Sequence, residues 1–232
     1  MDKIILPNLL VIGGTGFIGY HLILAAKKEK WKVASLSLNK PKSYRYVSGV
    51  NYIRTDISNF KKLKKKLRKS YDYVVNLGGY GDHTFFKKEG NEVINAHFVG
   101  LVNLTKIFSR KKIRKFIQIG SSEEYGNTRA PQSESTHGQP ISPYALAKLA
   151  ATRFLVMKNN IEKYPVTILR FFLVYGPQQD NNRILPQIIS GCLKNKKFPV
   201  SKGDQIRDFC YVDDAVKAII LALKSKKING EI

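Results

Sequence analysis

A tyrosine and a lysine stand four positions apart in the stretch SPYALAK, residues 142–148. On a helix, residues i and i+4 lie on one face, with roughly 5–6 Å between their β-carbons. Tyr144 and Lys148 can therefore act on the same substrate atom, provided that this face borders a pocket. The same spacing also occurs by chance on surface helices, where the two side chains do no chemistry. The rest of the chain has to decide between these two interpretations.

A glycine-rich turn near the N-terminus predicts a nucleotide site. The stretch VIGGTGFIGYHL follows an apolar run and opens a helical pattern, and it satisfies G-x-G-x-x-G through Gly14, Gly16 and Gly19. Gly13 provides a second match, G-x-x-G-x-x-G. The glycines permit a tight turn and let the backbone approach a pyrophosphate, which then sits at the N-terminus of the helix. The alternative is a plain glycine turn without a ligand.

Alternating strand and helix patterns predict the scaffold that would position these residues. Short runs rich in Val, Ile and Leu are typical of buried parallel strands, and longer segments with helical periodicity separate them. This order predicts an α/β fold, a doubly wound parallel sheet that binds its ligand beyond the carboxyl ends of the strands. The expected strands are 8–13, 31–38, 50–53, 71–78, 115–121 and 166–172, and the expected helices are 17–30, 59–69, 91–110 and 142–162.

The end of the second expected strand bears on the choice between NAD and NADP. The fingerprint normally places an acid about 20 residues after the glycines, where it binds the ribose of NAD. Here Ser37 stands near that position, and Lys40, Lys42 and Arg45 follow. An uncharged strand end with nearby cations suits the 2′-phosphate of NADP, so we expect NADP in preference to NAD. Asp56, after the next strand, could reach the adenine or could simply begin a helix.

The chain of 232 residues carries a formal net charge of +23, which raises the question of a nucleic-acid partner. The most basic run, KKLKKKLRKS at 61–70, has the pattern of an amphipathic helix, because Phe60, Leu63 and Leu67 share one apolar face. The other lysines are spread along the whole chain. We therefore expect a general lysine bias and no nucleic-acid partner.

Cysteines and apolar runs limit the other classes of protein. The two cysteines do not form a CxxC pair, so neither a disulfide framework nor a metal site is indicated. No apolar run approaches the roughly 20 residues of a membrane span. The N-terminus lacks the basic start and small-residue cleavage site of a signal peptide. A cytoplasmic protein without a membrane partner is expected.

A series of motifs resembles the extended short-chain dehydrogenases/reductases, and more narrowly the sugar-nucleotide epimerase/dehydratase family. The order of these motifs along the chain is that of the family, which favours the chemical interpretation of Tyr144 and Lys148. The motifs are the glycine turn, IGSSEEYG (119–126), SPYALAK (142–148), LRFFLVYGPQQ (169–179) and RDFCYVDDA (207–215).

The resemblance also implies a domain organisation. It predicts a Rossmann-type NAD(P)-binding domain at 1–172 and a small, apparently truncated substrate-binding region at 173–232, with 206–224 returning to the Rossmann part. Helices near 91–110 and 142–162 commonly pair across a two-fold axis in this family, so a homodimer is expected. Relatives usually continue for several more elements, and a truncated cofactor-binding protein without turnover is therefore one alternative.

Roles for individual residues follow from the resemblance. Tyr144 would exchange a proton with a sugar hydroxyl or carbonyl, and Ser121 would hydrogen-bond the same oxygen. Lys148 would hold the nicotinamide ribose and lower the pKa of the tyrosine, since a cation within about 4–6 Å favours the charged form by roughly 1–3 units. Glu123 falls where dehydratases of the family keep a carboxylate for the sugar C5, and Ser122 falls where they often keep Asp or Ser.

Further residues complete the predicted site. His97 and Leu173 depart from the family, which often has Asn at both positions, so substrate anchoring would shift to arginines. The substrate-binding prediction comprises Tyr80, Ser122, Glu123, Arg183 and Arg207, with His83 beside Tyr80. The cofactor-binding prediction comprises Gly13, Gly14, Thr15, Gly16, Phe17, Ile18, Gly19, Ser37, Lys40, Arg45, Asp56, Ile57, Leu77, Gly78, Gly79 and Lys148.

The stretch GSSEEYG also looks like that of reductases acting on 4-keto-6-deoxy sugar nucleotides. Combined with the expected NADP, it makes reduction of the C4 ketone of a nucleoside-diphosphate-4-keto-6-deoxyhexose the first expectation. The alternatives within the family are a sugar-nucleotide 4-epimerase and a 4,6-dehydratase, in which Glu123 would work as the base at C5. Net consumption of the cofactor separates the reductase from both.

Overall fold

Six parallel strands form the central sheet of the computed structural model, which describes residues 6–79, 90–200, 202–227 and 229. Their order in the sheet is β3-β2-β1-β4-β5-β6, so the chain starts in the middle and winds outward in both directions. This arrangement confirms the predicted doubly wound α/β fold. The strands are β1 (Asn8–Ile12), β2 (Lys32–Ser37), β3 (Asn51–Arg54), β4 (Tyr73–Asn76), β5 (Lys115–Ser121) and β6 (Val166–Phe171).

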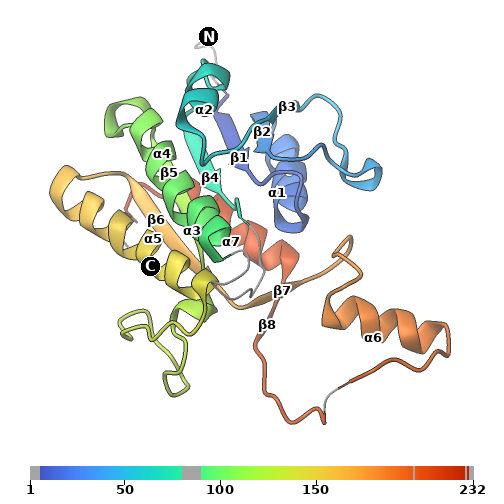
Figure 1. The fold of residues 1–232 in the computed structure, drawn as a ribbon. Coiled ribbons are helices and arrows are strands. Elements are labelled where there is room, and N and C mark those ends of the chain that lie inside the picture. The colour runs from blue at the N-terminus through green and yellow to red at the C-terminus, as the bar shows by residue number, and fades with distance from the viewer. Residues whose placement is uncertain (1–5, 80–89, 201, 228, 230–232) are drawn as a thin grey trace.

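Helices cover both faces of this sheet (Figure 1). Successive side chains of a strand point to opposite faces. In β1, Leu10 and Ile12 therefore pack into one hydrophobic core, and Leu9 and Val11 pack into the other. The first core is closed by α2 (Phe60–Lys66), α4 (Gly100–Ile107) and α5 (Pro143–Glu162), and the second by α1 (Phe17–Lys28) and α7 (Val212–Lys224).

The expected helix at 91–110 consists of three pieces. It begins with α3 (Gly90–Ile94), passes through a π-helical turn at Asn95–Val99 and continues as α4. π-Helical turns frequently occur at functional sites. This one places His97, a buried side chain, between α3 and α4.

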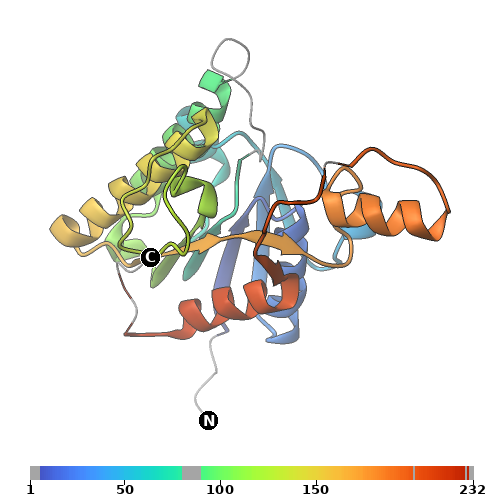
Figure 2. The same cartoon turned by 90° about the horizontal axis from the view of Figure 1, so that it is seen from below.

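A second, smaller parallel sheet follows the main one. It pairs β7 (Leu173–Tyr175) with β8 (Phe209–Tyr211), and α6 (Ile184–Leu193) lies between them in the chain. Figure 1 shows α6 to one side of the main sheet. Figure 2 shows α7 returning along the face of that sheet. No helix in the described ranges is both long and apolar enough to cross a membrane.

Candidate active site

The catalytic candidates come from the end of β5 and the first turns of α5. Ser142 caps the helix by accepting a hydrogen bond from the backbone N–H of Ala145 at 3.1 Å, which fixes where the helix begins. Tyr144 and Lys148 follow on one face of it. Ser121 ends β5, and its hydroxyl is hydrogen-bonded to that of Tyr144. The Nζ atom of Lys148 lies 5.7 Å from the centroid of the Tyr144 ring, so the structure brings the three side chains together.

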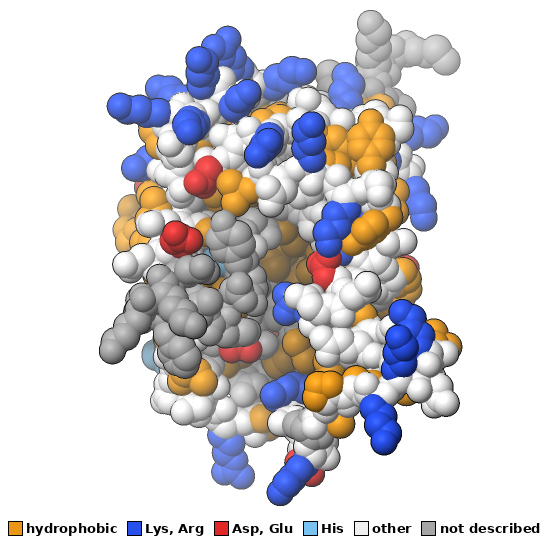
Figure 3. All heavy atoms as spheres, turned by 45° about the vertical axis from the view of Figure 1, so that its right-hand side comes forward, with side chains coloured by type: hydrophobic (Ala, Val, Ile, Leu, Met, Phe, Trp, Pro, Cys, Tyr) orange, Lys and Arg blue, Asp and Glu red, His pale blue; other side chains and the backbone are white. Residues whose placement is uncertain are grey.

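These side chains border the main cavity, which has a volume of about 540 Å³. Ser122 and Glu123 border it from the short 3₁₀ turn that follows β5, and Arg183 borders it from the start of α6. Figure 3 shows a hollow on this face, with hydrophobic side chains inside it and charged groups at its rim. The cavity therefore combines proton-transfer groups with a carboxylate and a cation.

Burial controls the protonation of Tyr144 and Lys148. It lowers the pKa of Lys148 to about 8, although the Glu124 carboxylate acts in the opposite direction. The Nζ atom donates a hydrogen bond to the Ile119 carbonyl at 2.8 Å. Burial also raises the pKa of Tyr144, and the hydrogen bond from Ser121 opposes this. The expectation that Lys148 lowers the pKa of the tyrosine is wrong for the protein alone, because loss of solvation outweighs nearby charges.

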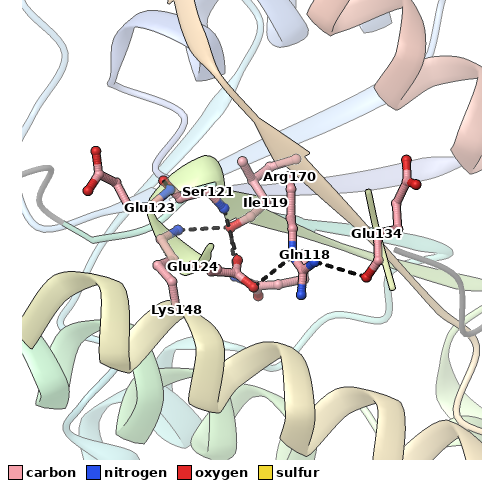
Figure 4. Close-up of polar contacts among 8 residues, drawn as sticks. All are labelled: Gln118, Ile119, Ser121, Glu123, Glu124, Glu134, Lys148 and Arg170. Carbon is pink, nitrogen blue, oxygen red and sulfur yellow. Dashed lines mark hydrogen bonds and ion pairs between the residues drawn. The ribbon is translucent and has the colours of Figure 1, made fainter. Parts of the chain in front are cut away.

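A buried ion pair supports the loop that carries Ser121 and Glu123. The Nε atom of Arg170, in β6, lies 2.9 Å from the carboxylate of Glu124, and both side chains are almost completely buried. The other oxygen of Glu124 accepts the backbone N–H of Ser121 at 2.9 Å. Figure 4 shows Glu123 pointing away from this pair. Sequence reasoning missed the pair, although an arginine within the apolar strand TILRFF signals a buried partner.

The glycine turn lies at the opposite wall of the main cavity, which Gly13, Gly16 and Gly19 border together with Phe17 and Ile18. Gly13 has φ of +79°, and a Cβ at Gly19 would lie 2.4 Å from the Gly13 carbonyl oxygen, so side chains are excluded at both positions. The first turn of α1 has no side-chain cap and no acidic residue. Its free N–H groups and its dipole suit an anion such as a pyrophosphate.

A second hollow extends from the glycine turn towards the end of β2. It shares Gly13, Gly16, Leu77 and Gly79 with the main cavity, so the two form one continuous groove. The predicted residues Thr15, Ser37 and Ile57 border this second part. The backbone N–H of Thr15 donates to the Ser37 hydroxyl at 3.3 Å. The groove is thus long enough to pass from the catalytic candidates to the end of β2.

The cations after β2 lie differently from what was expected. Lys40 borders a side hollow of about 300 Å³ together with Ser37 and Arg54, a residue that sequence reasoning missed. Arg45 does not face this hollow. Its side chain is 3% exposed and pairs with Asp180 at 3.1 Å, which satisfies its charge elsewhere. The prediction that Arg45 binds the ribose is therefore wrong.

Several other predicted residues take structural positions. Asp56 accepts the backbone N–H of Ser58 at 2.8 Å and so shapes the turn before α2. Gly14 packs against Ser35, and Gly78 packs against the side chain of Ile12. Arg207 is exposed and borders none of these hollows. Tyr80 and His83 lie outside the described residues.

His97 forms part of the wall beside Tyr144. The two rings meet edge to face with centroids 5.0 Å apart, and the imidazole is 4% exposed. A Cβ at Gly79, whose φ is +117°, would lie 2.0 Å from the Cε1 atom of His97. The histidine is packed between a strand end and the catalytic candidate, where it also borders the main cavity.

Comparison with protein families matches residues 9–232 to the NAD dependent epimerase/dehydratase family. Human dTDP-D-glucose 4,6-dehydratase is 31% identical over 240 residues, which cover 97% of this chain and 67% of the human protein. The dTDP-D-glucose 4,6-dehydratase of Dictyostelium discoideum is 26% identical over 260 residues, which cover 99% of this chain and 58% of that protein. The chain thus spans only 58% and 67% of the length of these two relatives.

A solved structure gives the same result for the fold. UDP-glucuronic acid 4-epimerase from Bacillus cereus, in complex with UDP-glucuronic acid and NAD, is similar with a TM-score of 0.83 and 30% identity. The match covers 97% of this chain and 76% of the epimerase. The relatives described here are dehydratases and an epimerase, so the comparisons favour the two alternatives over the expected reductase.

Proposed function

Because this chain belongs to the NAD-dependent epimerase/dehydratase family, we propose that it catalyses a redox-neutral reaction that begins at the C4 hydroxyl of a nucleoside-diphosphate sugar. One observation carries this proposal. Ser121, Tyr144 and Lys148 converge on the same cavity as Glu123, and the glycine turn borders that cavity from the other side. A nucleotide bound at the turn can therefore lie beside a sugar held at the catalytic candidates.

The residues of the groove fit a dinucleotide cofactor. The uncapped N-terminus of α1 would hold the pyrophosphate, Ser37 and Ile57 would lie beside the adenosine, and Lys148 would lie beside the nicotinamide ribose. When bound, the nicotinamide supplies reversible acceptance of a hydride from the sugar. Lys40 and Arg54 beside Ser37 support a preference for NADP, because two cations suit the 2′-phosphate.

Tyr144 would act as the acid and base at the C4 oxygen. During oxidation of C4, the C4 hydrogen leaves as a hydride and the hydroxyl proton passes to the Tyr144 phenolate. Ser121 stabilises the phenolate by donating a hydrogen bond. Since burial raises the pKa of Tyr144, the positive charges of Lys148 and of the oxidised cofactor have to supply the opposite effect when the site is filled.

Glu123 favours 4,6-dehydration as the reaction that follows. A C4 ketone acidifies the hydrogen at C5, and a carboxylate on the cavity wall can remove this proton. The C6 hydroxyl then leaves as water after protonation. The hydride returns to C6, a proton returns to C5, and the cofactor ends in its original oxidation state. The product is the 4-keto-6-deoxy sugar nucleotide, with the elements of one water molecule lost.

Epimerisation at C4 is the second candidate, because the 30% identical epimerase of known structure has the same fold over 97% of this chain. That reaction returns the hydride to the opposite face of C4 and needs no base at C5. Glu123 would then have no proton to move. Reduction of a 4-keto sugar, in contrast, would consume one reduced cofactor for each product formed.

Four exposed apolar side chains favour the predicted homodimer. Val99, at the start of α4, and Leu146, Met157 and Ile161, on α5, are 37%, 43%, 47% and 75% exposed. Burial of such side chains against a second copy is favourable by about 25 cal/mol per Å² of apolar surface. The division at residue 172, the cytoplasmic location and the absence of a nucleic-acid partner stay predictions.

The test begins with titration of the purified chain with NADPH and NADH, followed by incubation with nucleoside-diphosphate hexoses. Glu123→Gln separates the two candidate reactions. For a dehydratase, it should abolish the 4-keto-6-deoxy product and leave oxidation at C4 measurable as loss of deuterium from C4. For an epimerase, the rate should change little. Failure to bind either nucleotide, or net consumption of reduced cofactor, would contradict the proposal.

A further inference from the structure

Residues 176–183, between β7 and α6, form a strap that crosses the groove. Gln179, Asp180 and Arg183 of the strap border the main cavity. The opposite wall at this point is the glycine turn, from Gly16 to Gly19. The strap therefore faces the turn at which we place the pyrophosphate, in the middle of the continuous groove.

The strap is tied to the cofactor-binding side by charged contacts. The Oδ1 atom of Asp180 lies 2.8 Å from the Nζ of Lys42 and 3.1 Å from a guanidinium nitrogen of Arg45. Arg45 also donates a hydrogen bond to the Gln178 carbonyl. A third tie joins His21 of α1 to the Pro177 carbonyl at 2.8 Å. We call Lys42, Arg45 and Asp180 the clasp.

The clasp is a built contact and not two surface charges that happen to meet. The side chain of Arg45 is only 3% exposed, although it reaches a residue more than a hundred positions away in the chain. Burial opposes ionisation of Asp180, but the hydrogen bonds and charges of Lys42 and Arg45 outweigh it and lower the pKa of the carboxyl. Gln178 adopts a left-handed backbone with φ of +65°, which is uncommon for residues other than glycine.

We propose that the clasp retains the bound dinucleotide, so that one cofactor molecule stays in place through successive turnovers. The proposal rests on the function proposed above. The nicotinamide end lies at Tyr144 and Lys148, and the adenosine end lies at Ser37 and Ile57. A molecule that spans both ends passes beneath the strap, so it leaves only when Asp180 separates from its two cations. Retention suits a redox-neutral reaction, in which the hydride returns from the same nucleotide.

The experiment measures the rate at which bound nucleotide leaves. The full chain is loaded with NADPH, and separately with NADH, and an excess of the oxidised nucleotide is added while nucleotide fluorescence is followed by stopped flow. Asp180→Asn keeps the size of the side chain and removes its charge. Glu29→Gln is the matched control, because Glu29 forms an exposed ion pair of similar length, 2.8 Å, with Lys224. Arg45→Met tests the clasp from its other side.

We expect Asp180→Asn to raise the dissociation rate at least tenfold, with a smaller change in the association rate, and Glu29→Gln to leave both unchanged. Equal dissociation rates for wild type and Asp180→Asn overturn the inference, even if Arg45→Met does not fold. An equal increase in the control also overturns it, because the effect would then reflect net charge. A wild-type chain that binds neither nucleotide overturns the proposed function together with the inference, whereas binding without an effect of Asp180 overturns the inference alone.

Discussion

Removal of the buried lysine of the site should change how the stability of the protein depends on pH. Lys148 is 5% exposed, and its pKa is lowered from 10.5 to about 8 because burial disfavours the charged form. In the unfolded chain the same group titrates near its ordinary value. Between these two values the unfolded state binds more protons than the native state. The free energy of unfolding should therefore rise with pH in this window.

The size of this effect follows from the difference between the two pKa values. A shift of one unit corresponds to about 1.4 kcal/mol, so the full effect of Lys148 is about 3 kcal/mol between pH 8 and 10.5. Tyrosine ionisation complicates the upper end of this window. Between pH 7 and 9.5 the same linkage relation predicts that wild type gains about 2 kcal/mol relative to a variant without the amine.

Urea unfolding of wild type and Lys148→Met, at pH values from 7 to 9.5 and without nucleotide, measures this difference. A constant offset between the two proteins is expected from the lost hydrogen bond to the Ile119 carbonyl, and only the change of the offset with pH is informative. Lys224→Met removes the same charge from an exposed position and controls for net charge. Parallel curves for wild type and Lys148→Met would refute the reasoning, since the lysine would then be solvated in the folded protein.

Three other changes test the site at different points. Arg170→Met leaves the Glu124 carboxylate buried without its partner and should lower the free energy of unfolding by about 3–5 kcal/mol, as measured by urea unfolding. Gly19→Ala forces a Cβ against the Gly13 carbonyl oxygen and should weaken NADPH binding at least ~10-fold in a fluorescence titration, or about 1.4 kcal/mol. Tyr144→Phe should bind nucleotide like wild type and lose roughly 10²–10⁴ in turnover of the sugar nucleotide; normal turnover would remove the tyrosine from the mechanism.

Local patterns predicted the fold well, because they depend on the backbone. The glycine turn was predictable since left-handed φ at Gly13 and the close contact at Gly19 leave room for no other residue. The alternation in NLLVI, residues 8–12, was not needed to recognise a strand buried on both faces. The phase of α5 was predictable from Ser142 and Pro143, which mark its start and so bring Tyr144 and Lys148 onto one face.

Burial and long-range pairing were less accessible. The lowered pKa of Lys148 depends on how completely β5 and α5 enclose its side chain, which spacing alone does not reveal. The π-helical turn that presents His97 to Tyr144 leaves the apolar pattern of the expected helix almost unchanged. The reductase expected from GSSEEYG depended on a short loop that related enzymes of different activities share.

The failure at Arg45 has a physical cause that applies to the whole chain. With 40 basic and 17 acidic residues, cations occur near almost any site, so their presence after β2 carried little information. Acids are scarce, and each acid in the interior has a choice of cationic partners. The two that matter most here, Glu124 and Asp180, pair with Arg170 and with Arg45 and Lys42, which are distant in sequence. In a strongly basic protein, the positions of the acids therefore indicate the built parts of a site better than the positions of the lysines.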